Sequence, residues 1–457
     1  MRTVFCRNVW LAATALCFLS VVATAEQPSP ISLRQAVEIS LEKNPLRKAA
    51  LADTKVAAAG VRQARAGLFP NVTFSETATR GNDPVYVFGS RLRQQGFTSA
   101  DFELNQLNTP LPFGNFSTRL GGTWNLFNSM ASWRRIDQAK AMEEAASHQL
   151  DRAGQETVFR VVNAYYNLLL GKKRLEVTEQ AVKTAQSILD RSKSRFESGL
   201  TVESDLLDAQ VRMSTRQQEL VRAQNDLAFS QAQLEVAMGL PPSVTYEPAE
   251  TLSERDLPLA SVAEREKTAV DRRPDLKQIQ AEESVQKLGV AIAKSSFGPR
   301  VNAFASWQVD NPTLLAGGGG NNWVGGIELQ FDLFTGGSKQ AELARQKALQ
   351  DKIAALKQAA TDGVRLEVRR AYYDADAARQ QIAIARASVA QAQDSLRISR
   401  NRYDAGIVTI TDLLSTEEAT SRTQLDYWEA VAHFHTNNAS LELASGTLSL
   451  SSPVVQP

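Results

Sequence analysis

Apolar and polar residues alternate in several short segments of this chain, and a period of two predicts β-strands. The clearest alternation extends from Trp323 to Leu333, where charged and amide residues separate apolar residues or glycines. A second alternating segment lies at 120–126, and weaker alternation at 71–80 and 300–309 predicts two further strands. The residues expected on the apolar, lipid-facing side are Trp124, Leu126, Trp323, Ile327, Leu329, Phe331 and Leu333.

Between the strand segments the apolar period becomes helical. Proline costs about 3 kcal/mol inside a helix, and none occurs between Pro112 and Pro241 or between Pro312 and Pro453. Each proline-free stretch therefore predicts a long helix, a tight turn at Gly199 or Gly406, and a returning helix. The apolar residues step by three and four, a spacing shared by coiled coils and by simple helix pairs. They are Val158, Val161, Tyr165 and Leu168, and Val364, Val368, Tyr372 and Ala375.

The two halves of the chain repeat each other. Tyr165 recurs as Tyr372 and Gly199 as Gly406, both 207 residues later, whereas upstream Pro45 recurs as Pro274, 229 residues later. The difference of 22 residues must be absorbed between the two strands of the first half. The segment from Gly81 to Phe116 holds these extra residues, and we expect it to be an exposed loop, longer than its counterpart at 311–322.

The repeat divides the chain into segments. Residues 1–25 have the pattern of an export signal, with two arginines before an apolar run and Ala23-Thr24-Ala25 before the expected cut. Residues 26–240 form the first repeat of helix, strand, loop, strand, long helix, turn and returning helix, and the helix before the first strand is expected at 32–67. A proline-rich linker at 241–260 precedes the second repeat at 261–450, and 451–457 is a tail.

Composition excludes several classes of function. Both cysteines lie in the expected signal, so the mature chain has no thiol chemistry. Loss of the signal turns the formal charge of +1 into −1, which gives no electrostatic case for nucleic acid. His433 and His435 are poorly placed to share a metal, and Gly317 to Gly320 lack the lysine of a phosphate-binding loop. We expect no enzyme activity, cofactor or metal site.

The strands impose a condition on assembly. No apolar run after residue 25 approaches the roughly twenty residues of a spanning helix, so membrane insertion would use strands. Alternating strands suit a barrel wall with lipid outside and water inside, but four strands leave open edges that cost several kcal/mol per unpaired backbone group in hydrocarbon. Three copies would supply twelve strands and a water-filled interior. The expected fold is a mixed α/β membrane protein with an internal duplication.

With the duplication, the two glycine turns, and the strand ends at Trp124 to Phe127 and Phe331 to Phe334, the chain resembles the TolC-type outer-membrane efflux proteins, the outer membrane factor family. The resemblance implies a homotrimer whose twelve-stranded β-barrel in the outer membrane continues as an α-helical coiled-coil tunnel through the periplasm. It also implies a periplasmic adaptor protein that docks at the helix turns, and an inner-membrane pump of the RND or ABC type.

The same resemblance assigns roles to residues near the turns. It implies adaptor docking at the two turn motifs and a closed periplasmic gate beside them. Asp412 matches the first of two aspartates that ring the family's aperture, whereas Ser415 replaces the second. Asp205 and Tyr403 match a pair that holds the family's tip helices together, and Val408 replaces the arginine of that lock. The implied gate residues are Asp205, Tyr403, Asp412 and Ser415, and the implied docking residues are Gly199, Leu200, Gly406 and Ile407.

These sequence patterns are compatible with two functions. The first is an exit duct of a tripartite efflux or type I secretion system, which conducts substrates passively across the periplasm and outer membrane. The second is a periplasmic coiled-coil adaptor or structural envelope protein without a pore. The alternation from Trp323 to Leu333 favours the duct, because an adaptor has no use for a lipid-facing side opposite Glu328 and Gln330. The transported substrate is not encoded in these patterns.

Overall fold

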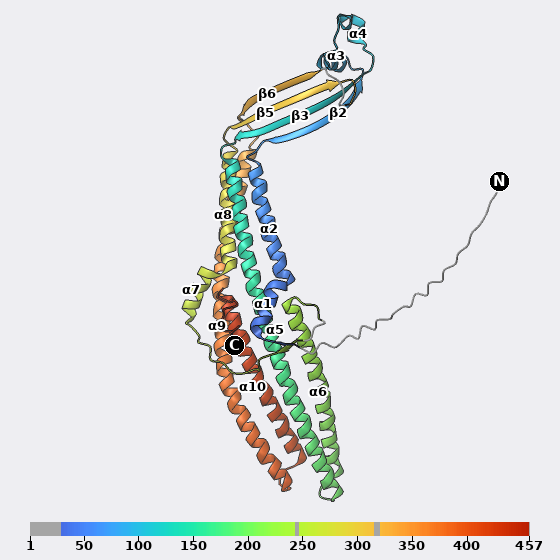
Figure 1. Cartoon of the computed structure of the whole chain (residues 1–457). Coiled ribbons are helices and arrows are strands. Elements are labelled where there is room, and N and C mark those ends of the chain that lie inside the picture. The colour runs from blue at the N-terminus through green and yellow to red at the C-terminus, as the bar shows by residue number, and fades with distance from the viewer. Residues whose placement is uncertain (1–28, 243–245, 315–319, 457) are drawn as a thin grey trace, which may run out of the picture.

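The computed structural model describes residues 29–242, 246–314 and 320–456, so the expected signal at 1–25 lies outside the described residues. The molecule is elongated, with a twisted β-sheet at one end and long helices that extend away from it to two tight turns (Figure 1). None of the described helices combines the length and the apolar character that crossing a membrane requires.

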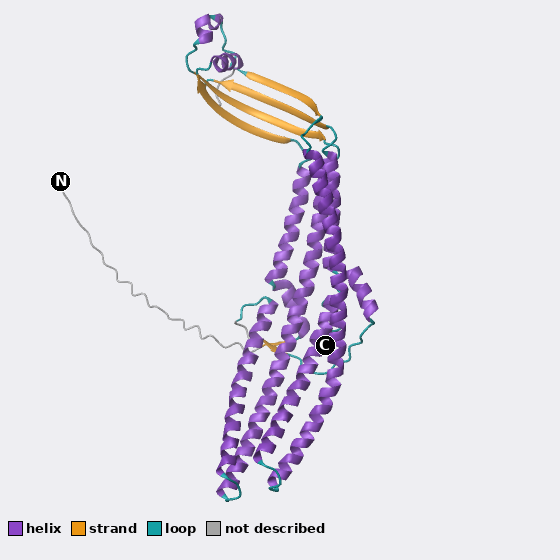
Figure 2. Ribbon diagram, turned by 180° about the vertical axis from the view of Figure 1, so that it is seen from behind, coloured by secondary structure: helices purple, strands orange, loops and turns teal. Residues whose placement is uncertain are grey.

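Two long helices form the axis of the molecule. Helices α5 (Ala131–Glu197) and α9 (Ser338–Asp404) each have 67 residues, about 100 Å at 1.5 Å per residue. Helices α6 (Glu203–Met238) and α10 (Ile410–Ala444) return alongside them, as Figure 2 shows. Both predicted helix–turn–helix arms are thereby confirmed. The stripe through Tyr165 is fully buried, because it packs against the neighbouring helices.

The helix expected at 32–67 is in fact two helices, α1 (Leu33–Lys43) and α2 (Pro45–Ala66). The chain breaks at Asn44, whose ψ of 125° is not helical, because a residue before proline is disfavoured in the α region. The second half breaks at the equivalent residue, Arg273, between α7 (Val262–Arg272) and α8 (Pro274–Ser295). The Pro45 and Pro274 signals for these breaks were present in the sequence.

At each break a returning helix ends against the start of the next one, so α2 continues α6 along α5 and α8 continues α10 along α9 (Figure 1). Gly239 ends α6 with a φ of +78°, and a Cβ there would lie 2.6 Å from the Cα of Asn44. Gly446 ends α10 with a φ of +69°, and its Cβ would lie 2.9 Å from the Cα of Arg273. Only glycine fits both the backbone conformation and the contact.

The sheet contains the strands that the alternation predicts. Strands β2 (Asn71–Gly81), β3 (Phe113–Phe127), β5 (Arg300–Asn311) and β6 (Asn321–Gln330) pair antiparallel in the order β2-β3-β5-β6. The prediction for the end of the last strand is wrong, because β6 stops at Gln330 and so excludes Phe331 and Leu333.

A β-bulge changes a second detail of the predicted apolar face. The register between β3 and β5 shifts between Asn125 and Phe127, which leaves Leu126 without a direct partner. Phe127 lies opposite Val301 instead, and Val301 pairs with Leu329. Phe127 therefore takes the place in the apolar row that the alternation assigned to Leu126, although both side chains are exposed.

The segment between β2 and β3 is not the loop that was predicted. It contains α3 (Pro84–Arg93), a 3-10 turn at Ser99–Phe102 and α4 (Leu104–Asn108). Asp83 caps α3 by accepting a hydrogen bond of 2.8 Å from the backbone N–H of Tyr86. These helices stand at the end of the molecule farthest from the helical tips (Figure 1). The counterpart in the second half lies partly outside the described residues, including Gly317 to Gly319.

A linker and the tail wrap the middle of the helical part. The short strands β1 (Ser29–Ile31) and β4 (Tyr246–Pro248) pair in parallel there. Leu252 and Leu257 of the linker and Val454 and Val455 of the tail are buried in the main core cluster, which also contains Tyr165. The linker and the tail therefore form part of the main core.

Candidate functional site

The sheet has two chemically different faces. Phe74, Leu120, Trp307 and Trp323 are cross-strand partners in one row, and all four are exposed. The adjacent row on the opposite face contains Ser75, Arg119, Gln308 and Asn322. On the apolar face Trp323, Ile327 and Leu329 are 82%, 71% and 70% exposed. An antiparallel sheet of this kind suits contact with lipid on one side and water on the other.

The sheet is open at β2 and β6. In the described chain these strands occupy the two ends of the order β2-β3-β5-β6, so each has one unpaired edge. The exposed apolar side chains continue past the end of β6, where Leu333 and Phe334 are almost fully exposed. A long, apolar and unpaired edge is a surface to which another strand binds.

The turns at the other end have the same backbone geometry in both arms. Gly199 and Gly406 have φ values of +71° and +74°. The following residues, Leu200 and Ile407, donate backbone hydrogen bonds of 2.8 Å to carbonyls of the preceding helices, which completes a Schellman end. Their side chains are 69% and 71% exposed. Each tip therefore presents an apolar side chain to solvent on a rigid turn.

The gate residues implied by the resemblance lie beside these turns, but Asp205 and Tyr403 do not bond each other within the described chain. Thr201 donates to the carboxylate of Asp205. Tyr403 is buried, with its hydroxyl 3.3 Å from the Ser192 hydroxyl and its ring under the Arg195 guanidinium.

Asp412 has a local partner too. It forms a capping box with Thr409, whose hydroxyl donates to the Asp412 carboxylate at 2.7 Å and accepts from the Asp412 backbone N–H at 3.2 Å. The bonds from the Thr409 hydroxyl and backbone N–H lower the pKa of Asp412 below its usual value. Ser415 lies one turn farther along α10 and donates to the Asp412 carbonyl. Asp412 and Ser415 are both exposed.

Arginines that the sequence analysis missed tie the two arms together. Arg191 of α5 donates to both carboxylate oxygens of Asp404 at 2.9 and 2.6 Å, and Arg195 donates to the Tyr403 carbonyl at 3.0 Å. Arg212 of α6 donates to Glu418 of α10 at 2.6 Å. Contacts between residues some 200 positions apart leave no periodic signal in a single sequence, so nothing in the pattern could have found them.

A further arginine on α6 forms a buried ion pair between the two arms. Arg216 donates to Glu417 of α10 at 2.8 Å and to Glu219 of its own helix at 2.7 Å. The Arg216 and Glu417 side chains are only 7% and 2% exposed. Unlike the pair of Arg191 and Asp404, which is about half exposed, this pair is shielded from water and ions.

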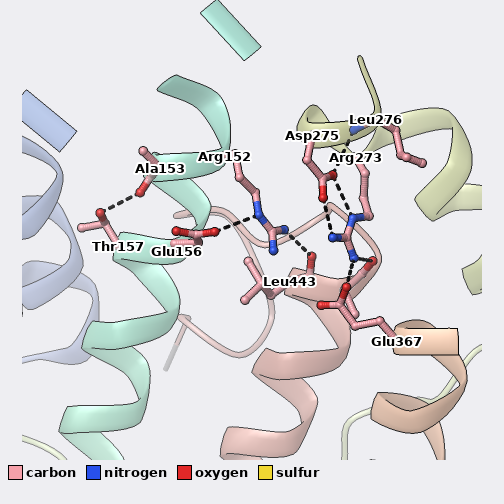
Figure 3. Close-up of polar contacts among 10 residues, drawn as sticks. Arg152, Ala153, Glu156, Thr157, Arg273, Asp275, Leu276, Glu367 and Leu443 are labelled. Atoms are coloured by element: carbon pink, nitrogen blue, oxygen red, sulfur yellow. Dashed lines mark hydrogen bonds and ion pairs between the residues drawn. The ribbon is translucent and has the colours of Figure 1, made fainter. Parts of the chain in front are cut away.

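The break between α7 and α8 is held by a buried arginine (Figure 3). Arg273 donates to Asp275 at 2.6 Å, to Glu367 of α9 at 2.6 Å and to the Ala444 carbonyl at the end of α10 at 3.1 Å. Burial opposes ionisation of Asp275, but the Arg273 guanidinium outweighs it and lowers the Asp275 pKa. Arg152 joins the same region by donating to the Leu443 carbonyl. These bonds fix α8 onto α10.

His433 and His435 lie in different environments. His435 is buried, stacks on Tyr166 with ring centroids 4.4 Å apart, and its Nε2 lies 2.9 Å from the Ser253 carbonyl. Burial lowers the pKa of His435, and the Nε2–H donates this bond because a carbonyl oxygen only accepts. His433 is exposed on another side of α10. Among the described residues no group of three acidic, histidine or cysteine side chains is arranged to hold a metal.

Comparison with known proteins identifies the family to which this architecture belongs. A family model described as "Outer membrane efflux protein" matches residues 36–240 and 267–447, most of the chain. The chain belongs to the outer membrane efflux protein family. Its location is the outer membrane, with an extension into the periplasm.

Individual relatives of this efflux protein have low sequence identity to it, but they match most of its length. The outer membrane protein TolC of Vibrio cholerae is 24% identical over 70% of this chain and 74% of its own length. The alkaline protease secretion protein AprF of Pseudomonas aeruginosa is 22% identical over 96% of this chain and 88% of its own. The solved outer membrane channel CmeC of Campylobacter jejuni superposes with a TM-score of 0.77 at 18% identity, covering 92% of this chain and 87% of that one.

Proposed function

We propose that this efflux protein acts as a homotrimeric exit duct, through which the substrates of an efflux or type I secretion system pass without chemical change. The observation that carries the proposal is the two-faced sheet on top of helices about 100 Å long. The exposed side chains of Trp323, Ile327 and Leu329 provide the lipid-facing surface, and the opposite polar face of the sheet contacts water. A poreless adaptor would leave this surface without a role.

The open sheet supports the number of copies. Four strands leave the edges of β2 and β6 unpaired, and hydrocarbon offers their backbone groups no partner. Three copies supply twelve strands, enough for a closed wall around a water-filled interior. The helices of the three copies then enclose a tunnel in continuation of the barrel.

The tips supply the surface for a periplasmic adaptor. Leu200 and Ile407 are large, exposed and apolar, and they stand on turns fixed by Gly199 and Gly406. Exposed apolar groups on a rigid turn suit docking of a partner's helical hairpin. An inner-membrane pump of the RND or ABC type lies beyond the adaptor and selects the cargo. The names of the relatives include a protease secretion protein and a toluene efflux pump protein.

The gate lies at the same end. In the trimer, copies of Asp412 and Ser415 gather near the axis, and the carboxylates favour cations in the aperture. Tyr403, which is buried against Ser192 and Arg195, holds α9 to α5 inside each copy, and Asp205 accepts from Thr201 beside the other turn, so both residues act on the gate by fixing the tip of their own chain. The arginine ties between α5 and α9 and between α6 and α10 stiffen each copy's pair of arms.

The test of the proposal is the state of the mature protein in membranes. Fractionation is expected to recover it with the outer membrane, and mass measurement in mild detergent is expected to give the mass of three chains. Recovery in the soluble fraction, or a monomer under mild conditions, would contradict the duct.

A further inference from the structure

A recess lies just below the sheet, at the end of α8 that leads into β5 (Figure 1). Its volume is about 400 Å³, and its walls come from α5, α8 and α9 together with β3 and β5. Helix α8 contributes small residues, Gly289 and Ala293, which leave the space open. A Cβ at Gly289 would lie 2.8 Å from the Oε1 atom of Gln346 on α9, so a side chain at this position would occupy part of the recess.

The recess lies on the water side of the sheet. Side chains alternate between the two faces of a strand, and the polar face contains Arg119 of β3 and Gln308 of β5. Asn125 is an even number of residues from Arg119, and both lie in β3. Arg300 is likewise an even number of residues from Gln308 in β5, so both strand residues of the recess belong to the polar face. In the proposed duct this face surrounds the lumen, and the recess opens toward the molecules that pass through.

Arg135 brings an unpaired positive charge to the recess. Its side chain lines the recess from α5 and makes no hydrogen bond or ion pair with any residue that the structure describes. The carboxylate of the lining, Glu342 of α9, is already engaged, because Arg345 donates to its two oxygens at 2.8 and 2.7 Å. The N–H donors of the Arg135 guanidinium are therefore available to water or to a ligand.

A second cation lines the recess from the sheet. Arg300 of β5 donates to the Asp332 carboxylate at 2.8 Å. The same carboxylate also pairs with Lys339 of α9 at 3.0 Å, so two cations share one anion. Together with the unpaired Arg135, this arrangement leaves a net positive charge around the recess.

We propose that the recess binds an oxyanion group, a carboxylate or a phosphate, of small molecules inside the duct. The position of this site in the lumen rests on the proposed function. The planar guanidinium groups of Arg135 and Arg300 offer paired N–H donors that match the oxygens of either group. A volume of about 400 Å³ accommodates a small organic anion.

The site lies far from the gate. In a trimer three such recesses form a ring at the base of the sheet, whereas the Asp412 carboxylates stand at the opposite end of the helices (Figure 1). The two ends of the tunnel therefore favour groups of opposite charge.

Calorimetric titration of the purified protein with pyrophosphate and, separately, with citrate tests the site at low ionic strength. The wild-type protein is expected to bind at least one of these anions. Arg135→Gln is expected to weaken binding about tenfold or more, because a charge-assisted contact is lost. The matched control is Lys140→Gln, which removes one positive charge from the same helix but lies outside the recess, paired with Asp137. It is expected to bind as the wild type does.

A second variant tests the recess without removal of a cation. Gln346→Glu keeps the size of the side chain but places a carboxylate in the lining, and it is expected to abolish binding. In conducting trimers pyrophosphate is expected to reduce the current, and Arg135→Gln is expected to require an about tenfold higher concentration for the same reduction.

The outcomes separate the site from the duct. Equal weakening in Lys140→Gln and Arg135→Gln, or failure of the wild-type protein to bind either anion, would overturn the site even if the trimer conducts. Binding that depends on Arg135 without any effect on the current of conducting trimers would overturn the position in the lumen. Binding that depends on Arg135 in a trimer that passes no current would keep the site and overturn the proposed function.

Discussion

At the scale of single residues, Arg216 and Glu417 show how burial decides what an ion pair contributes. Both side chains are shielded between α6 and α10, so removal of one leaves the other as an unpaired buried charge, at a cost of about 3–5 kcal/mol. The exposed pair of Arg191 and Asp404 has the same chemistry and comparable distances. Its contribution is about 0–1 kcal/mol, because water and salt screen it.

This contrast gives a prediction. Arg216→Met is expected to lower the unfolding temperature of the purified protein clearly, whereas Arg191→Met, the matched control, is expected to change it little. Replacement of both partners, in Arg216→Met/Glu417→Met, is expected to recover most of the loss, because no unpaired charge remains. Equal shifts for the two single variants, measured by thermal unfolding in detergent, would show that burial of the pair is unimportant.

Asp412 leads to a prediction about pH. The Thr409 hydroxyl and N–H lower the pKa of Asp412, so the carboxylate stays charged above that lowered pKa and loses its charge only as the pH falls through it. Block of the channel current by multivalent cations is therefore expected to persist below the usual pKa of aspartate, about 3.9. Thr409→Val is expected to move the loss of block to higher pH, and Asp412→Asn to weaken block at every pH. Block that is unchanged in Asp412→Asn would remove this residue from the aperture.

At the scale of elements, patterns repeated along the chain predicted the fold, and contacts across the chain were missed. The alternation around Trp323 and the proline-free stretches were sufficient for the strands and long arms, because period and helix breaking are local properties. The bulge at Leu126 and the arginine ties depend on a partner strand or helix, which a single sequence does not specify. Pro45 did signal the break at Asn44, but the helical period on both sides concealed it.

The tips are the elements on which we expect export to depend. Leu200→Asp/Ile407→Asp is expected to abolish export, because charges replace the apolar groups that an adaptor binds, while the yield of trimer stays unchanged. Leu111→Asp, an equally exposed site near the opposite end of the molecule, is the matched control and is expected to export normally. Export at the wild-type level from the double tip variant would place adaptor docking elsewhere.

The segment between β2 and β3 tests the orientation of the molecule. Although Gln94, the residue that caps the end of α3, donates a hydrogen bond to Asn115 of β3, Leu104 and Leu111 are strongly exposed. Protease added to intact cells is expected to cut between these two residues and to spare Gly199 and Gly406. Cleavage at the glycine turns in intact cells would reverse the topology.

At the scale of the whole molecule, the two-faced sheet, the long arms and the tied tips combine into one device. In the proposed duct the sheet provides a wall with a lipid side and a water side, and the stacked helices α2 on α6 and α8 on α10 extend that wall along α5 and α9 (Figure 1). The buried contacts of Arg273, Asn44 and the two capping glycines keep each stack continuous. Passive conduction requires a wall that is continuous from the sheet to the tips and that has its gate at the tips alone.

A continuous duct conducts ions, so the decisive experiment is the electrical conductance of purified trimers in planar lipid bilayers. We expect discrete current steps that are small in the wild-type protein, because the proposed gate at the tips is closed at rest, and larger in Arg216→Met, because α6 and α10 are then less firmly held. Trimers of verified mass that insert into the bilayer yet pass no current, in both the wild-type and the Arg216→Met protein, would contradict the existence of a continuous duct.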